Sequence, residues 1–137
     1  MAERFEELRV WQAARTLTQD VYEITKNSTF ARDFALKDQI RRSSISVMSN
    51  IAEGFESRTR PRFIDHLGIA KASAGEVRCQ LYVALDQGYL DEATFKRMND
   101  SADKIARQLY RLMNHLKQQD TSGRVRELPA EYDFRGT

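Results

Sequence analysis

Apolar side chains recur every three to four residues through most of this 137-residue chain. That spacing places them on one side of an α-helix, whereas a strand needs an alternation with a period of two, which no segment shows. Four segments carry such a stripe, and we predict a helix for each, over residues 5–26, 33–57, 60–87 and 91–118. The last two stripes each run for three heptads, which favours nearly parallel packing of long helices.

The residues between the stripes are of the kinds that end one helix and begin the next. "NSTFAR" at 27–32 favours turns and caps, and Thr59, which precedes Arg60 and a proline, fits an N-cap. Gly88 is expected to end the third helix and Asp91 to cap the fourth. Because the connections are short, neighbouring helices have to be antiparallel. The sequence therefore predicts an all-α fold, an antiparallel up-down-up-down four-helix bundle in one domain over 1–118.

The helical pattern stops after Gln118. The segment 119–137 is polar and contains glycine and proline, which predicts a flexible C-terminal tail. Tyr132 and Phe134 are the two tail residues suited to docking on the bundle, because they carry large apolar rings.

The second helix contains an unusual run, "IRRSSISVMSNIAEGF" at residues 40–55. Small polar residues interrupt its core stripe, and a second apolar line runs beside that stripe. We predict that the second line contacts a neighbouring subunit, because a monomer has little reason to expose it. The alternative is a monomeric bundle with a broad core face, in which the polar residues are paired internally. The core stripe is Ile40, Val47, Ile51 and Phe55, the small polar residues are Ser43, Ser46, Asn50 and Gly54, and the second line is Ile45, Met48 and Ala52.

The small residues on this helix are of a size that permits another helix to approach closely. Gln39, Asn50 and Glu53 are expected to be structural polar residues. Glu53 and Arg42 are expected to be buried partners, either within one bundle or across subunits. An oligomer would explain a helix that has to satisfy its own core, a neighbouring subunit and solvent at once.

Composition limits the class of protein. Hydrophobic residues make up 41% and charged residues 31% of the chain, which fits a folded, helix-rich, soluble protein. No apolar run approaches the roughly 20 residues of a membrane span, and the first residues are charged rather than signal-like. The single cysteine, Cys79, excludes an internal disulfide and a cysteine-based zinc site. We therefore expect a cytoplasmic protein without a membrane partner.

Candidate catalytic groups are few. A di-iron site in a four-helix bundle needs two Glu-x-x-His pairs, and neither His66 nor His115 follows an acidic residue by three positions. Cys79 is expected to be a small buried hydrophobic residue, and the serines lack histidine–carboxylate partners at a suitable spacing. We therefore predict that the protein is not an enzyme and uses no metal, no cofactor and no small-molecule substrate.

The basic residues are more informative. The net charge is only +2, so the position of the charges matters more than their number. Arg58, Arg60 and Arg62 crowd the junction of the second and third helices, where guanidinium groups suit phosphates. We predict nucleic-acid contacts at these arginines, and rank a further set behind them. That set is Arg41, Arg42 and Lys71.

A structural explanation of the same arginines stays open. Arg41 and Arg42 have Asp38 and Glu53 as possible acidic partners, and cations near a helix C-terminus are favourable in any case. The basic stretch contains few aromatic residues, so stacking on nucleic-acid bases is not indicated there.

Several stretches resemble the bacterial 23S rRNA intervening-sequence proteins, a four-helix-bundle family. The resemblance covers most of residues 5–117, with "FEELRVWQAARTLTQDVYEIT" at the start and "LKDQIRRSSISVMSNIAEGFESRTRPRFIDHLGIAKASAGEVRCQL" in the middle. The chain departs from the family pattern at "SAGEVRCQ", where Ala74 and Arg78 replace a leucine and an acidic residue. The family's hallmarks are present as Leu8-x-x-Trp11, Gln39-Ile40-x-Arg42, Ser46 and Asn50-Ile51-Ala52-Glu53-Gly54.

The resemblance implies a bundle that assembles into a closed ring, a homopentamer in this family. Related proteins accompany diversity-generating retroelements, where they bind a reverse transcriptase and nucleic acid. No catalytic residues come with the family. We therefore predict a non-enzymatic, oligomeric module that binds structured RNA, a ribonucleoprotein or a nucleic-acid-handling protein through its arginines. The alternative is a protein–protein interaction scaffold that does not bind nucleic acid.

Overall fold

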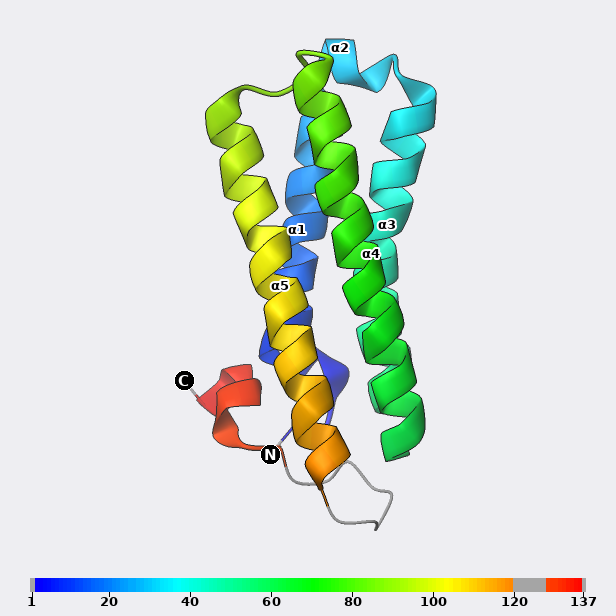
Figure 1. Ribbon diagram of the computed structural model, residues 1–137, viewed down its shortest axis with the longest axis vertical. Coiled ribbons are helices and arrows are strands. Elements are labelled where there is room, and N and C mark those ends of the chain that lie inside the picture. The colour runs from blue at the N-terminus through cyan, green and yellow to red at the C-terminus, as the bar shows by residue number, and fades with distance from the viewer. Residues whose placement is uncertain (1, 120–127, 137) are drawn as a thin grey trace.

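The computed structural model describes residues 2–119 and 128–136, and these form an all-helical bundle (Figure 1). Its four long helices are α1 (Arg9–Thr25), α3 (Phe34–Glu56), α4 (Arg60–Asp86) and α5 (Glu92–Gln118). The short elements are the 3-10 turn η1 (Phe5–Glu7), the single-turn helix α2 (Ser28–Ala31), and the 3-10 turns η2 (Ala130–Tyr132) and η3 (Phe134–Gly136). The predicted four long helices are confirmed.

Helix boundaries follow the predicted signals in most places. Asp91 accepts a hydrogen bond from the Thr94 N–H at 2.7 Å, and Gly88 has a φ of 76°, so both ends of the α4–α5 turn are as predicted. The first helix begins at Arg9 rather than at residue 5, because η1 precedes it. The break at 27–32 contains the short helix α2, which Asn27 caps through its side chain.

The four long helices enclose one core. α4 packs against both α3 and α5, and α1 closes the bundle from behind (Figure 1). The predicted stripes supply the buried side chains, because each puts one residue per turn toward the bundle axis. The largest of them, all less than 2% exposed, include Phe55, Phe63, Leu67, Leu81, Met98 and Leu109, and Phe30 of α2 is equally buried.

The small polar residues of α3 face α4 of the same chain. The Ser46 and Ser73 hydroxyl oxygens lie 2.8 Å apart, and Asn50 Oδ1 lies 3.0 Å from His66 Nδ1. Asn50 also donates to the Ser46 carbonyl oxygen at 2.9 Å. The close approach of another helix, which these small residues were expected to permit, is made by α4 of the same chain.

Other polar residues are more exposed than expected for a single bundle. Arg42 and Glu53 are both exposed, and Glu53 lies 3.7 Å from His66 Nδ1 instead of pairing with Arg42. The two are therefore not buried partners within one bundle, and their pairing across subunits stays a prediction. Gln39 is exposed as well. Cys79 is exposed, because it lies on the side of α4 opposite the core stripe. Charged and polar groups therefore stay in water here and avoid the cost of desolvation.

The described part of the C-terminal segment is packed on the bundle, unlike the flexible tail that its composition predicted. Asp133 is only 4% exposed and forms an antiparallel bridge with Leu8. Arg135 donates to the Asp133 carboxylate at 2.9 Å and pairs with Glu7 at 2.7 Å. The Tyr132 ring lies 5.6 Å from that of His115, so one of the two aromatic candidates docks on α5. Predictions for 120–127 and for residue 137 lie outside the described residues.

Candidate nucleic-acid interface

The turn from α3 into α4 holds Arg58 in an unusual backbone conformation. Its φ is 61°, in the left-handed region, where a residue with a β-carbon costs roughly 1–2 kcal/mol. Its N–H donates to the Phe55 carbonyl oxygen at 3.3 Å, and its guanidinium lies 5.3 Å from the centroid of the Phe55 ring. Its Nη2 also donates to the Glu3 carbonyl oxygen at 3.4 Å. A position that usually takes glycine therefore carries a cation.

Arg60 and Arg62 lie in the first turn of α4. Thr59 is the N-cap residue, but its side chain makes no capping hydrogen bond. The N–H groups at the start of α4 therefore lack a side-chain acceptor from the cap. A helix N-terminus carries a partial positive charge, which adds to that of the guanidinium groups. Together they make the lower end of the bundle attractive to an anion.

These arginines are not neutralised by the chain itself. Among the described residues, no carboxylate oxygen lies within 4.0 Å of Arg58, Arg60 or Arg62. Arg62 is exposed, while Nη1 of Arg60 is buried without a hydrogen-bond partner. A buried guanidinium nitrogen without an acceptor costs free energy. We call Arg58, Arg60 and Arg62 the junction arginines.

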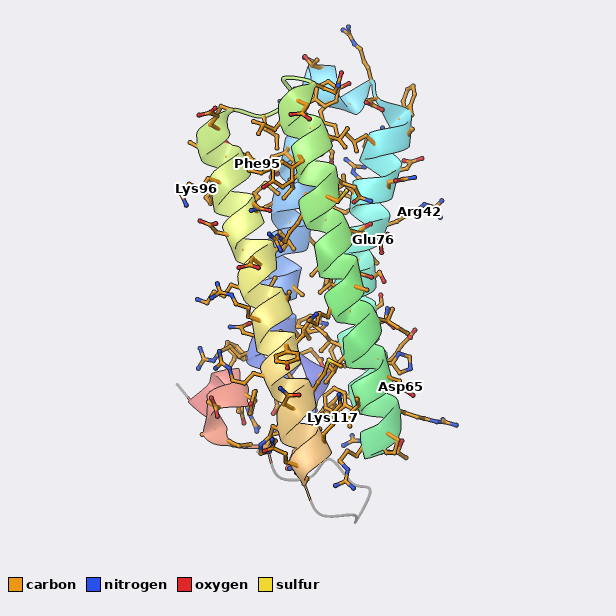
Figure 2. The ribbon with its side chains drawn as sticks, in the orientation of Figure 1. Arg42, Asp65, Glu76, Phe95, Lys96 and Lys117 are labelled. Carbon is orange, nitrogen blue, oxygen red and sulfur yellow. The ribbon has the colours of Figure 1, made fainter. Side chains whose placement is uncertain are left out.

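The other predicted phosphate contacts lie elsewhere. Arg41 is already engaged, because its Nε donates to Thr25 Oγ1 at 2.8 Å and its guanidinium lies 4.3 Å from the Tyr22 ring centroid. Arg42 points away from α3 into solvent (Figure 2). It precedes Arg58 by sixteen residues, about 24 Å along the helix axis. The junction arginines are neighbours in sequence at the α3–α4 turn, whereas Arg41 and Arg42 lie elsewhere on α3.

Lys71, the third residue of the second-ranked set, lies close to an exposed aromatic ring. It is exposed on α4, and its Nζ lies 5.9 Å from the centroid of the Tyr110 ring on α5. Tyr110 is 56% exposed, and Tyr82 on α4 is 51% exposed. These rings were not predicted, because they lie outside the basic stretch of the sequence. The signal available in the sequence was their position off the core stripes.

The second apolar line of α3 is only partly exposed. Ile45 is 41% exposed, whereas Met48 and Ala52 are half-buried, and Met48 packs against the core of its own bundle. Further apolar side chains are exposed on α4, namely Ile69 at 50% and Val83 at 42%. Ile45 is therefore the member of the line with most surface left for a neighbouring subunit.

Two further features are absent from residues 2–119 and 128–136, a metal-ligand cluster and a membrane-spanning helix. In that part of the chain, no three histidine, cysteine, aspartate or glutamate side chains are arranged to hold a metal ion. None of its helices combines the length and apolar content that crossing a membrane requires.

The four long helices of the described part of the chain define a compact all-α bundle. Residues 6–111 match the family described as 23S rRNA-intervening sequence protein, and the chain belongs to that family. No curated protein matches the chain.

A solved structure supports the fold. The chain is similar to a protein of unknown function from the S23 ribosomal protein family of Bacteroides thetaiotaomicron, with a TM-score of 0.71 and 23% sequence identity. The match covers 76% of this chain and 97% of that one. At this identity the likeness concerns the bundle alone.

Proposed function

We propose that this protein binds RNA through the phosphate groups that the junction arginines attract. The observation that carries the proposal is the position of these three cations at the uncapped start of α4, without an ion-pair partner in the described chain. Guanidinium groups hydrogen-bond to phosphate oxygens in a fixed geometry, and a helix N-terminus favours the same charge.

We further propose that the protein acts as a ring-shaped homo-oligomer. The exposed side chain of Ile45 supports a subunit contact on the outer side of α3. Assembly matters for binding, because a weak phosphate site becomes effective when several copies engage one polyanion. The junction arginines would then form a repeated pattern that reads the shape and charge of a folded RNA rather than its bases.

The experiment that tests the proposal compares two triple variants. In the first, Arg58, Arg60 and Arg62 become glutamine, and in the matched control, Lys26, Arg32 and Lys37 become glutamine at the opposite end of the bundle. Both lose three positive charges, so the difference between them reports position rather than net charge. We expect the first variant to bind a structured RNA at least tenfold more weakly than the control. Equal affinities in two folded variants would rule the junction arginines out.

A scaffold that binds a protein partner is the second candidate, because Ile69 and Val83 expose apolar surface on α4. The two functions respond differently to salt. RNA binding through phosphates weakens steeply as salt rises, whereas docking on an apolar surface does not.

A further inference from the structure

The seam between α4 and α5 combines exposed aromatic rings with cations from both helices. The antiparallel helices place Lys71 beside Tyr110, Arg78 beside Asn99, and Tyr82 beside Phe95. We define the α4–α5 seam by its outward-facing residues, which are Lys71, Arg78 and Tyr82 on α4 and Arg107, Tyr110 and Lys117 on α5. Figure 2 shows Phe95 at its upper end and Lys117 at its lower end.

The two tyrosines of the seam, Tyr82 and Tyr110, are exposed. Neither hydroxyl has a hydrogen-bond partner in the described chain, and each side chain is more than half exposed. Other tyrosines are engaged, since the Tyr89 hydroxyl donates to Asp33 at 2.9 Å and the Tyr22 ring lies under Arg41. Exposing two large rings on one seam forgoes the stabilisation that their burial would give.

The charge on the seam is positive. Its four cations face one carboxylate at close range, that of Asp103, which lies 3.3 Å from Arg78 and 3.2 Å from Arg107. Within the described ranges, Lys71 and Lys117 have no acidic partner closer than 4.0 Å. Asp86, one turn beyond Tyr82, limits the positive stretch at the upper end.

The seam also continues to the junction arginines. Arg60 and Lys71 are eleven residues apart on α4, which is three turns and about 16 Å, so they lie on the same side of that helix. On α5, Tyr110 and Lys117 are seven residues apart and likewise share a side. A polyanion held at the junction arginines would therefore meet Lys117, Lys71 and Tyr110 in succession.

We propose that the α4–α5 seam binds single-stranded RNA, with unpaired bases stacked on Tyr110 and Tyr82 and phosphates held by Lys71 and Lys117. The proposal rests on the RNA-binding function proposed above and names the kind of RNA. In a duplex, both faces of each base are covered by its neighbours, so only an unpaired base has a face free for a tyrosine ring. Stacking with flanking cations needs no base-specific hydrogen bonds, and the seam offers few groups for them.

The test uses full-length protein and two RNA probes, a 12-nucleotide single strand without self-complementarity and a duplex of the same sequence. The double variant Tyr82→Leu, Tyr110→Leu removes both rings, while Tyr82→Phe, Tyr110→Phe keeps the rings and removes only the hydroxyl groups. We expect the leucine variant to bind the single strand at least about fivefold more weakly than wild type, with the phenylalanine variant within about twofold. Duplex binding should change by less than about twofold in both.

Four results would overturn the inference. They are equal single-strand affinity in the leucine variant and wild type, an equal loss in the phenylalanine variant, an equal loss on the duplex, and a change of native mass in the leucine variant. The last would assign the seam to a contact between copies of the chain. If Tyr82→Leu fails to fold, the single pair Tyr110→Leu and Tyr110→Phe carries the same comparison.

The same assay separates the two proposals. If the junction-arginine variant loses affinity and the leucine variant does not, the proposed function is supported and the seam is not the binding site for single-stranded RNA. The reverse pattern supports the seam and removes the junction arginines as the binding site. A wild-type protein that binds neither probe would contradict both.

Discussion

Gly54 on α3 and His66 on α4 pack so closely that a β-carbon on Gly54 would lie 2.8 Å from the His66 β-carbon. The same position would be 2.9 Å from Cδ1 of Phe63. The missing side chain of Gly54 therefore sets the distance between the two helices at the lower end of the bundle. That distance also lets Asn50 reach His66 across the helix pair.

We expect Gly54→Ala to destabilise the fold by roughly 1–3 kcal/mol, because the added methyl group overpacks the helix contact. Gly75→Ala is the matched control, since a β-carbon added there would meet nothing within 4 Å and alanine favours the helix by up to about 1 kcal/mol. Urea denaturation followed by circular dichroism measures both. A Gly54→Ala protein as stable as Gly75→Ala would show that the helices separate at little cost.

Arg58 offers a second test, because it combines a strained backbone with a proposed function. Arg58→Gly and Arg58→Ala both remove the side chain, but only glycine adopts a φ of 61° without strain. We expect the glycine variant to be more stable than the alanine variant by about 1 kcal/mol and both to bind RNA more weakly than wild type. Equal stabilities in thermal denaturation would contradict the strain at this position.

The docking of the C-terminal segment should depend on pH through Asp133. Hydrogen bonds from Arg135 hold the pKa of its carboxyl group well below its usual range. A carboxyl with a lowered pKa stabilises the fold above its ordinary pKa of about 3.9, and that contribution is lost as the pH falls further.

Asp133→Asn should therefore lower the melting temperature at pH 7, and its difference from wild type should shrink progressively below about pH 4. Asp100→Asn removes an exposed carboxylate that pairs with Lys96, so its effect should stay small throughout. A difference that stays constant from pH 7 to pH 3 would show that the Asp133 charge does not hold the segment.

Assembly can be tested at Ile45, whose side chain is more exposed than that of Met48 and is not part of the core. Ile45→Glu should dissociate the proposed ring without unfolding the bundle, since the new charge can stay in water only in the monomer. Light scattering gives the native mass, and Arg32→Glu, at the end of α2, serves as the control. An Ile45→Glu protein with the wild-type mass would remove this residue from the subunit contact.

The long helices could be predicted because the residues that determine a helix lie close together in sequence. Stripes with helical spacing, the glycine at 88 and the cap at 91 each act within a few residues of where they lie. The role of Asn50 could not be predicted in the same way, since its partner His66 is sixteen residues away on another helix. Size and polarity indicated close helix packing but not which helix provides it.

In the candidate interface too, contacts between sequence neighbours could be predicted and contacts between distant residues could not. The junction arginines are neighbours in sequence, so their cluster was visible without a structure. Lys71 and Tyr110 are 39 residues apart and become neighbours only when α4 and α5 pack antiparallel. The packing of residues 128–136 on the bundle was not predicted for a related reason, because their polar composition conceals the contacts of Asp133 with Leu8 and Arg135.

The dependence of RNA affinity on salt concentration tests whether the junction arginines contact phosphates. For a single strand, the logarithm of the affinity falls with the logarithm of the salt concentration by about 0.7 per phosphate neutralised. If the junction arginines neutralise three phosphates in each chain, replacing all three by glutamine should reduce that slope by about two for each chain that contacts the RNA. The Lys26, Arg32 and Lys37 control should keep the wild-type slope. Identical slopes in all three proteins would contradict binding through these arginines.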